Sequence, residues 1–229
     1  MLYTEETVKA NIRNRNGKRV FFLGVGDSLT PSARDYLLQQ RIEIRPESQA
    51  KIKTFHLQDG STLDEKPEEM THLRGNILVP KSHPVIAFRG AIDTLQAELL
   101  LAQLVVAPPI QTQLEQILTL ARNLIRWEVM EEAAYMETLC GLTPAQLRSH
   151  SHHPEKYYNQ PHFIPSFEDG REILQLNRVR CAARAAELAA IHAFADATGG
   201  CTRRDIVQLL NRMSSMLYIL MIQLKAARS

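Results

Sequence analysis

The most constraining feature of the sequence is a series of long amphipathic segments that begins at Ile86. Apolar residues recur there every three or four positions, which places them on one face of a helix. The first two stripes, separated by Pro108-Pro109, consist of Ile92, Leu95, Leu99 and Ala102, and then of Leu114, Ile117, Leu118, Ala121, Leu124 and Ile125. Because the prolines end the first segment, the pattern predicts two antiparallel helices.

Further helices are predicted downstream. The stretch Thr143–Gln146 combines a capping threonine, a proline at the first position and a glutamine at the third, which predicts a short third helix. His150–Gly170 contains three prolines and is predicted to be a loop. Two last helices, Arg171 to about Ala197 and Thr202 to about Ala227, are separated by Gly199-Gly200. The expected fold is mainly α, a bundle of four or five helices.

The first eighty residues have a mixed pattern of short elements. Two strands, one helix and one hairpin are predicted, at Arg19–Leu23 and Ile42–Ile44, at Thr30–Gln40, and at Lys51–Leu57 with the residues from Thr62 onward. Thr30 can cap the helix that Pro31 begins, and Asp59-Gly60 suits a tight turn. We therefore expect a small N-terminal α/β segment with a hairpin over residues 1–80 and the helical bundle over residues 81–229.

Composition excludes several classes of protein. The 229 residues include 27 Lys and Arg and 25 Asp and Glu, a formal net charge of +2, so charge indicates neither a nucleic acid nor an anionic membrane as partner. Three widely spaced cysteines argue against a secreted disulfide framework, and the charged first twenty residues do not resemble a secretory signal. Leu99–Ile110 is too short to span a bilayer. The expected location is cytoplasmic.

One predicted helix carries a charged constellation. Arg180, Arg184 and Glu187 are spaced at i, i+4 and i+7 and so share one face, on a background of alanines. Two guanidinium groups in this arrangement can hold a polyphosphate or an acidic partner by bidentate hydrogen bonds. Spacing alone favours the alternative, a solvated face that contains an ordinary i,i+3 ion pair.

Three motifs resemble the cobalamin adenosyltransferase family in order and spacing. They are Pro80-Lys81 upstream of a G-x-x-D-x-L helix start at Gly90–Leu95, R-x-x-x-R-x-x-E at Arg180–Glu187, and Asn211–Ser214. This set is similar to the PduO-type branch of the family. The stretches Leu29–Leu37 and Met70–Lys81 are in addition similar to the EutT-type branch, the adenosyltransferases of ethanolamine utilization.

The resemblance implies an enzyme that transfers the 5′-deoxyadenosyl group of ATP to the cobalt of a reduced corrinoid such as cobalamin. It implies that Lys81 and Arg184 contact the triphosphate with Mg²⁺, that Glu187 and Asn211 face the nucleoside, and that Asp93 pairs with Arg180. Arg184, Arg180 and Asp93 are the implied catalytic residues. The family's phosphate loop is not intact here, since Gly26–Thr30 and Asp59–Thr62 match it only weakly.

Relatives use a bulky apolar side chain to displace the lower axial ligand of the corrinoid, because a four-coordinate cobalt(II) is easier to reduce. The matching segment here is Phe163–Phe167, which precedes Arg180 at a similar distance. The resemblance thus implies that Phe163 or, as second candidate, Phe167 has this role. The alternative is that both aromatic side chains only anchor a loop.

EutT-type enzymes can bind a divalent metal through a His followed by a cysteine cluster. The matching positions here are His56, Glu68, Glu69 and His72, so the thiolates are absent. Carboxylate and imidazole ligands could still hold zinc, iron or manganese. The alternative is a set of exposed polar residues, and the same applies to the histidines at positions 150, 152 and 153, which could also line the corrinoid entrance.

Two other functions stay open. A non-enzymatic corrinoid carrier or sensor could keep the same bundle, since Ser215 stands where relatives usually have Asp. A helical metal-carboxylate protein ranks last, because its Glu-x-x-His motif occurs only at Glu69–His72. The resemblance also implies a homo-oligomer, dimer or trimer, an electron-donating flavoprotein or reduced flavin, and association with a bacterial microcompartment.

Overall fold

A computed structural model describes residues 1–15, 17–49 and 54–228. The chain divides into two compact units, unit 1 (Met1–Pro80) and unit 2 (Lys81–Ser229). Each unit is described by itself. That residues 81–229 alone form the adenosyltransferase domain stays a prediction.

Unit 1 is built from short strands and two helices. Its elements are β1 (Leu2–Tyr3), α1 (Glu5–Ala10), β2 (Arg13–Arg15), β3 (Lys18–Leu23), β4 (Ser28–Leu29), α2 (Pro31–Gln39), β5 (Glu43–Pro46), the 3₁₀ helix η1 (Glu47–Gln49), β6 (Phe55–Leu57), β7 (Thr62–Leu63), β8 (Met70–Arg74) and β9 (Ile77–Pro80). Among the described residues, β1 pairs with β4, the order β2-β3-β5 forms a second sheet, and β7-β6-β9-β8 forms a third.

The predicted helix cap at Thr30 and the predicted turn at Asp59-Gly60 are both present in unit 1. The Thr30 side chain accepts a hydrogen bond from the Ala33 amide at 3.3 Å and caps α2, because the first turn of a helix leaves its amides unpaired. β6 and β7 pair antiparallel around Asp59-Gly60, where Gly60 has a φ of 85°. Residues 51–53 of the predicted hairpin lie outside the described residues.

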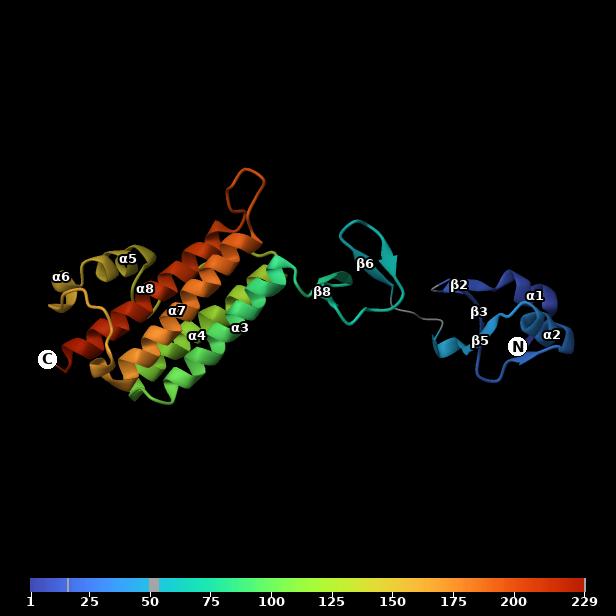
Figure 1. Cartoon of the computed structure of the whole chain (residues 1–229), viewed down its shortest axis with the longest axis horizontal. Helices are drawn as coiled ribbons and strands as arrows, with labels where there is room; N and C mark the ends of the chain where they lie inside the picture. Colours follow the sequence, from blue (N-terminus) through green and yellow to red (C-terminus); the bar gives the residue numbers. More distant parts are fainter. Residues whose placement is uncertain (16, 50–53, 229) are drawn as a thin grey trace. The chain divides into compact units, whose positions relative to one another are not determined.

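Unit 2 is mainly helical, as predicted. Its elements are α3 (Pro84–Gln103), α4 (Pro108–Val129), α5 (Pro144–His152), α6 (Pro154–Tyr158), the 3₁₀ helix η2 (Phe167–Asp169), α7 (Gly170–Ala193) and α8 (Arg204–Ala226). α3, α4, α7 and α8 run side by side as a bundle, and α5 and α6 pack against α8 (Figure 1). None of the described helices is both long enough and apolar enough to cross a membrane.

Two boundaries differ from the sequence prediction. Helix α3 ends at Gln103, before Pro108-Pro109, and the prolines instead begin α4, where proline at the first position needs no hydrogen-bond donor. The predicted loop His150–Gly170 contains the end of α5 and the short helix α6, which Pro154 begins. The loop prediction was therefore wrong for residues 150–152 and 154–158, because Pro154 starts a helix rather than excludes one.

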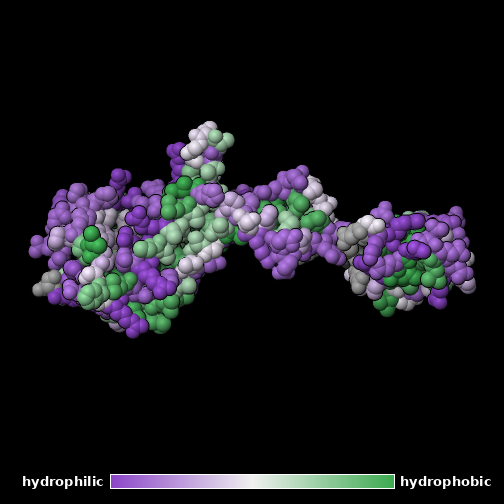
Figure 2. All heavy atoms as spheres, in the orientation of Figure 1, coloured by the Kyte–Doolittle hydropathy of each residue, from purple (hydrophilic) through white to green (hydrophobic). Residues whose placement is uncertain are grey.

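The surface of unit 2 is unevenly polar. In Figure 2, hydrophobic colour gathers over the long helices, while hydrophilic colour covers most of the region of α5 and α6. The exposed apolar side chains of α3 and α7 include Leu100, Leu101, Leu188 and Ile191. Such side chains on neighbouring helices are available to a further packing partner.

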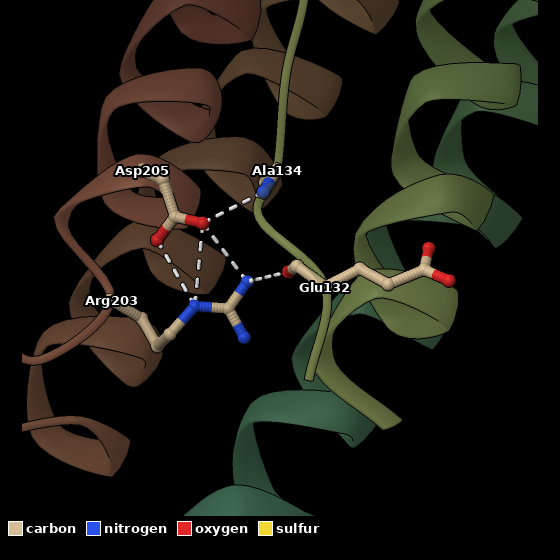
Figure 3. A network of polar contacts seen from close by, with 4 residues as sticks. All are labelled: Glu132, Ala134, Arg203 and Asp205. Carbon is tan, nitrogen blue, oxygen red and sulfur yellow. Dashed lines mark hydrogen bonds and ion pairs between the residues drawn. The ribbon is translucent and has the colours of Figure 1, made fainter. Parts of the chain in front are cut away.

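A polar network fixes the start of α8 against the segment that follows α4 (Figure 3). Arg203 binds the Asp205 carboxylate through Nε at 3.0 Å and donates from a terminal nitrogen to the Glu132 carbonyl at 2.8 Å. Asp205 also accepts from the Ala134 amide at 2.8 Å. Because Asp205 and Arg203 bind residues 132 and 134, the network joins the start of α8 to the segment that follows α4.

Replacing Asp205 with Asn should reduce stability in a pH-dependent way. Desolvation opposes ionisation, but hydrogen bonds from Arg203, Ala134 and Ile206 outweigh it, so the pKa of Asp205 lies below its ordinary value of 3.8. The contribution is fully present above that value and is lost as the pH falls through the lowered pKa of the folded state. We expect D205N to lower the free energy of unfolding by about 1–3 kcal/mol at pH 7, as measured by urea denaturation.

The difference in free energy of unfolding between the unmodified protein and D205N should narrow as the pH is lowered from 7 toward 3. Because both proteins share every other titrating group, the comparison isolates this carboxylate. A gap of constant size across that range would contradict the prediction.

Candidate functional site

Two residues that the resemblance assigns to the nucleoside meet in the structure. Glu187 of α7 accepts a hydrogen bond from the Asn211 amide of α8, with 3.1 Å between Oε1 and Nδ2. Both side chains are half-buried. The neighbouring α7–α8 contacts, Arg180 with Tyr218 and Asp169 with Lys225, occur progressively further along α8, so the helices are antiparallel.

The implied phosphate and catalytic residues are less constrained. Arg184 is exposed on α7 and forms no hydrogen bond or ion pair with any described residue. Lys81 is also exposed and lies at the beginning of unit 2, three residues before α3. A guanidinium without a protein partner keeps all its donors available to an anion. That Lys81 and Arg184 share one triphosphate stays a prediction.

The expected pair between Asp93 and Arg180 does not form within the described chain. The Arg180 guanidinium instead donates to Asn177 Oδ1 at 3.2 Å from Nε and 3.0 Å from a terminal nitrogen. Asp93 is exposed on α3. Asn177 lies one helical turn before Arg180, so a local i,i+3 hydrogen bond replaces the predicted ion pair.

Phe163 is held against α8 by Tyr218 and Lys225. The Tyr218 hydroxyl accepts a hydrogen bond from the Phe163 amide at 3.3 Å and lies 3.1 Å from Nδ1 of His162. The other ring nitrogen of His162 donates to the His152 carbonyl at 3.1 Å, which leaves Nδ1 of a neutral ring to accept the tyrosine proton. Lys225 Nζ lies 4.6 Å from the centre of the Phe163 ring.

Phe167 has a different environment. Its side chain is 84% exposed at the start of η2, and the neighbouring Ile164 is 90% exposed. The structure therefore distinguishes an anchored aromatic residue, Phe163, from a free one, Phe167. Which of them contacts a corrinoid stays a prediction.

A cavity of about 250 Å³ lies beside these residues. Its lining consists of Ser151, His152, His162, Arg180, Ser214, Ser215 and Tyr218. On α8 the cavity residues follow Asn211, and on the other side His162 directly precedes Phe163. The cavity thus lies between the residues assigned to ATP and the first residue assigned to the corrinoid.

The four residues proposed to bind a metal do not converge. Across the sheet His56 of β6 is paired with Ile77 and His72 of β8 with Leu78. Paired residues share a face and consecutive residues alternate, so the two histidines point to opposite faces. Throughout the described chain, no three His, Cys, Asp or Glu side chains are grouped so that they could hold a metal ion. His56, Glu68, Glu69 and His72 therefore do not fit a shared metal site.

The sequence analysis missed several residues that surround the cavity. Tyr218, Ser214 and His162 line it, and Arg212 is buried nearby on α8. The i+7 spacing from Asn211 to Tyr218 was a usable signal, because it places both on one face of a helix. A larger cavity of about 480 Å³ on α4 contains none of the predicted site residues.

The bundle and its α7–α8 site define a class of helical nucleotide-dependent transferase. The sequence model of the cobalamin adenosyltransferase family matches residues 62–224, so the chain belongs to the cobalamin adenosyltransferase family.

Within that family, the chain is 30% identical over 242 residues to the corrinoid adenosyltransferase EutT of Salmonella typhimurium (strain LT2), a match that covers 96% of this chain and 90% of that protein. The corrinoid adenosyltransferase EutT of Escherichia coli K12 is 28% identical with the same coverage.

Proposed function

We propose that this protein is an ATP:corrinoid adenosyltransferase of the EutT type. In the reaction, the electron pair of cobalt(I) forms a bond to the 5′ carbon of ATP while the carbon–oxygen bond breaks. Triphosphate leaves with the electrons of the broken bond, so the protein supplies no nucleophile. Its contribution is to orient the two substrates, neutralise the leaving group and exclude water.

The observation that carries this proposal is the order of side chains along α7 and α8. The hydrogen-bonded Glu187 and Asn211 mark the nucleoside end, and the anchored Phe163 marks the corrinoid end. The cavity lined by Arg180 separates them. This order supports a site that binds ATP and the corrinoid next to each other along α7 and α8.

Arg184 is proposed to hold the triphosphate of MgATP, together with Lys81. Both side chains are exposed cations, and Arg184 has no protein acid as a partner in the described chain. A free guanidinium can bind phosphate through two parallel hydrogen bonds. No step is assigned to an additional metal ion, because the N-terminal candidates do not converge.

Anaerobic incubation of chemically reduced cob(I)alamin with MgATP tests the function. Adenosylcobalamin and triphosphate should appear in equal amounts, followed by the change in absorbance, both before and after treatment with a chelator and restoration of Mg²⁺. No product despite corrinoid binding would favour the carrier or sensor. Activity that is lost permanently after chelation would contradict the absence of an essential second metal.

Replacing Tyr218 with Phe should weaken binding of the corrinoid but not binding of ATP. The variant keeps the ring beside Arg180 but loses the hydroxyl that binds His162 and the Phe163 amide. Two net hydrogen bonds are worth about 1–3 kcal/mol, so we expect roughly a 5- to 100-fold rise in KM for cobalamin. The KM for ATP should stay within about twofold, as measured by initial rates.

Tyr158→Phe is the matched control, because it removes a tyrosine hydrogen bond to His150 at 2.8 Å, and neither residue lines a cavity beside Phe163. An equal rise in KM for both substrates of Y218F would mean that Tyr218 only stabilises the fold. An unchanged KM for cobalamin would show that the hydroxyl does not position Phe163.

We also propose an oligomeric state, an electron donor and a cellular location. The exposed apolar side chains of α3 and α7 support a homo-oligomer, dimer or trimer, because association would remove them from water. A reduced flavin or flavoprotein is the proposed electron donor. The similarity to EutT supports a role in ethanolamine utilization, in the cytoplasm and near a microcompartment.

A further inference from the structure

A second cavity adjoins the one beside Phe163. It has a volume of about 370 Å³ and is lined by Ala145, Arg148, Ser149, His152 and His153. His152 belongs to both linings, so the two cavities are neighbours on either side of this residue. We call the joint surface the α5–α8 pocket.

The α5–α8 pocket is lined by hydrogen-bond donors and cations. Two arginines, three histidines, four serines and a tyrosine contribute to it, and neither lining includes an aspartate or glutamate. Among the described residues, the Arg180 guanidinium hydrogen-bonds to the Asn177 amide oxygen and to no acid, and Arg148 forms no ion pair. The protein therefore leaves much of the positive charge of this pocket without a countercharge.

A buried arginine adds to this charge. Arg212 is 9% exposed, and its Nε has no hydrogen-bond partner among the described residues. Burial, and next the positive charge of Arg148, lowers the pKa of the Arg212 guanidinium, while Glu187 opposes this. Burying a cation is costly unless another charge compensates it. Arg212 lines neither cavity, but its interaction with Arg148 places a further positive charge near the pocket.

The position of the pocket indicates which anion it takes. His162 lines the pocket and directly precedes Phe163, the proposed corrinoid contact. In cobalamin the lower base is tethered by a nucleotide loop that contains one negatively charged phosphodiester. When the base is displaced, this loop moves away from cobalt and carries its phosphodiester with it, where a cationic surface can bind it. Resting on the proposed function, we propose that the α5–α8 pocket binds the phosphodiester of the corrinoid nucleotide loop and so selects complete cobalamin over cobinamide, which lacks this group.

The double variant Arg148→Gln, His152→Asn tests the inference. Both side chains are exposed, so the fold should be retained. Binding of cob(II)alamin and cob(II)inamide is measured by titration without ATP, and the KM for ATP is measured separately. We expect the Kd for cob(II)alamin to rise about tenfold, since hydrogen bonds to charged groups are the stronger ones. The Kd for cob(II)inamide and the KM for ATP should not change.

Lys156→Gln, which removes an exposed cation of α6 outside both cavities, is the matched control and should bind both corrinoids as the unmodified protein does. An equal loss for both corrinoids, or none for cob(II)alamin, would overturn the inference. A selective rise in the KM for ATP would overturn it in favour of a triphosphate site. If the unmodified protein transfers the adenosyl group but does not discriminate between the corrinoids, the inference fails alone; if it binds neither, the function fails as well.

Discussion

Replacing Arg184 with Ala should reduce kcat/KM for adenosyl transfer by about 10²- to 10³-fold, the usual effect of removing a group that stabilises developing charge. The leaving triphosphate gains charge as the carbon–oxygen bond breaks, and this exposed guanidinium has no competing protein partner in the described chain. The fold should persist, because α7 is packed through other side chains, including the buried Ala183 and Ala186. Initial rates with cob(I)alamin and MgATP, together with a thermal unfolding curve, provide the measurement.

Arg171→Ala is the matched control for this experiment. Arg171 is an exposed arginine on the same helix, outside the proposed site. Its removal should leave the rate within about twofold, as is usual for surface substitutions. An unchanged kcat/KM in the Arg184 variant would contradict the assignment of the triphosphate site, even if the chain proved to be an adenosyltransferase.

Replacing Arg89 with Ala should have the largest effect on stability. Arg89 of α3 donates from Nε to Glu128 Oε2 of α4 at 2.7 Å, and the Glu128 side chain is fully buried. Removing the cation leaves a buried carboxylate without this partner, which costs about 3–5 kcal/mol. Urea denaturation should therefore show a loss of that size in the free energy of unfolding.

Two comparisons test the physical reason for this loss. Arg122→Ala removes a surface ion pair with Glu115, whose nearest atoms are 3.5 Å apart, and should cost no more than about 1 kcal/mol. The double variant R89M/E128M replaces both charges with apolar groups and should recover most of the lost stability. A loss below about 1 kcal/mol in R89A would show that the carboxylate finds other compensation.

The long helices were predictable because their signals are local. The apolar spacing of α3 and α4 and the caps at Thr30 and Thr143 depend only on residues within a few positions of one another. α6 was missed because its support is tertiary: the Tyr158 hydroxyl lies 2.8 Å from Nδ1 of His150, and Tyr157 stacks on the same ring. The proline- and histidine-rich composition of this segment does not predict these contacts.

The site residues also divide into those with a local signal in the sequence and those that depend on tertiary contacts. The contact between Glu187 and Asn211 agrees with the motifs, whereas the link from Tyr218 to Phe163 joins residues 55 positions apart and depends on how the loop folds over α8. The metal prediction failed because spacing along the chain does not specify strand register. Pairing of His56 with Ile77 and of His72 with Leu78 separates two histidines that a motif comparison places together.

The helix α8 carries one proposed ATP contact, Asn211, and the tyrosine that anchors the proposed corrinoid contact, Tyr218. Asn211, Ser214 and Tyr218 lie on successive turns of α8, and the rise of an α-helix sets the distance from the first to the last at roughly 10 Å. The separation between nucleotide and corrinoid is then fixed by helix pitch rather than by a mobile loop. Inserting one residue between Asn211 and Tyr218 would rotate one binding half by about 100° relative to the other while leaving each half intact. Such a protein would bind both substrates and yet hold them out of line for transfer.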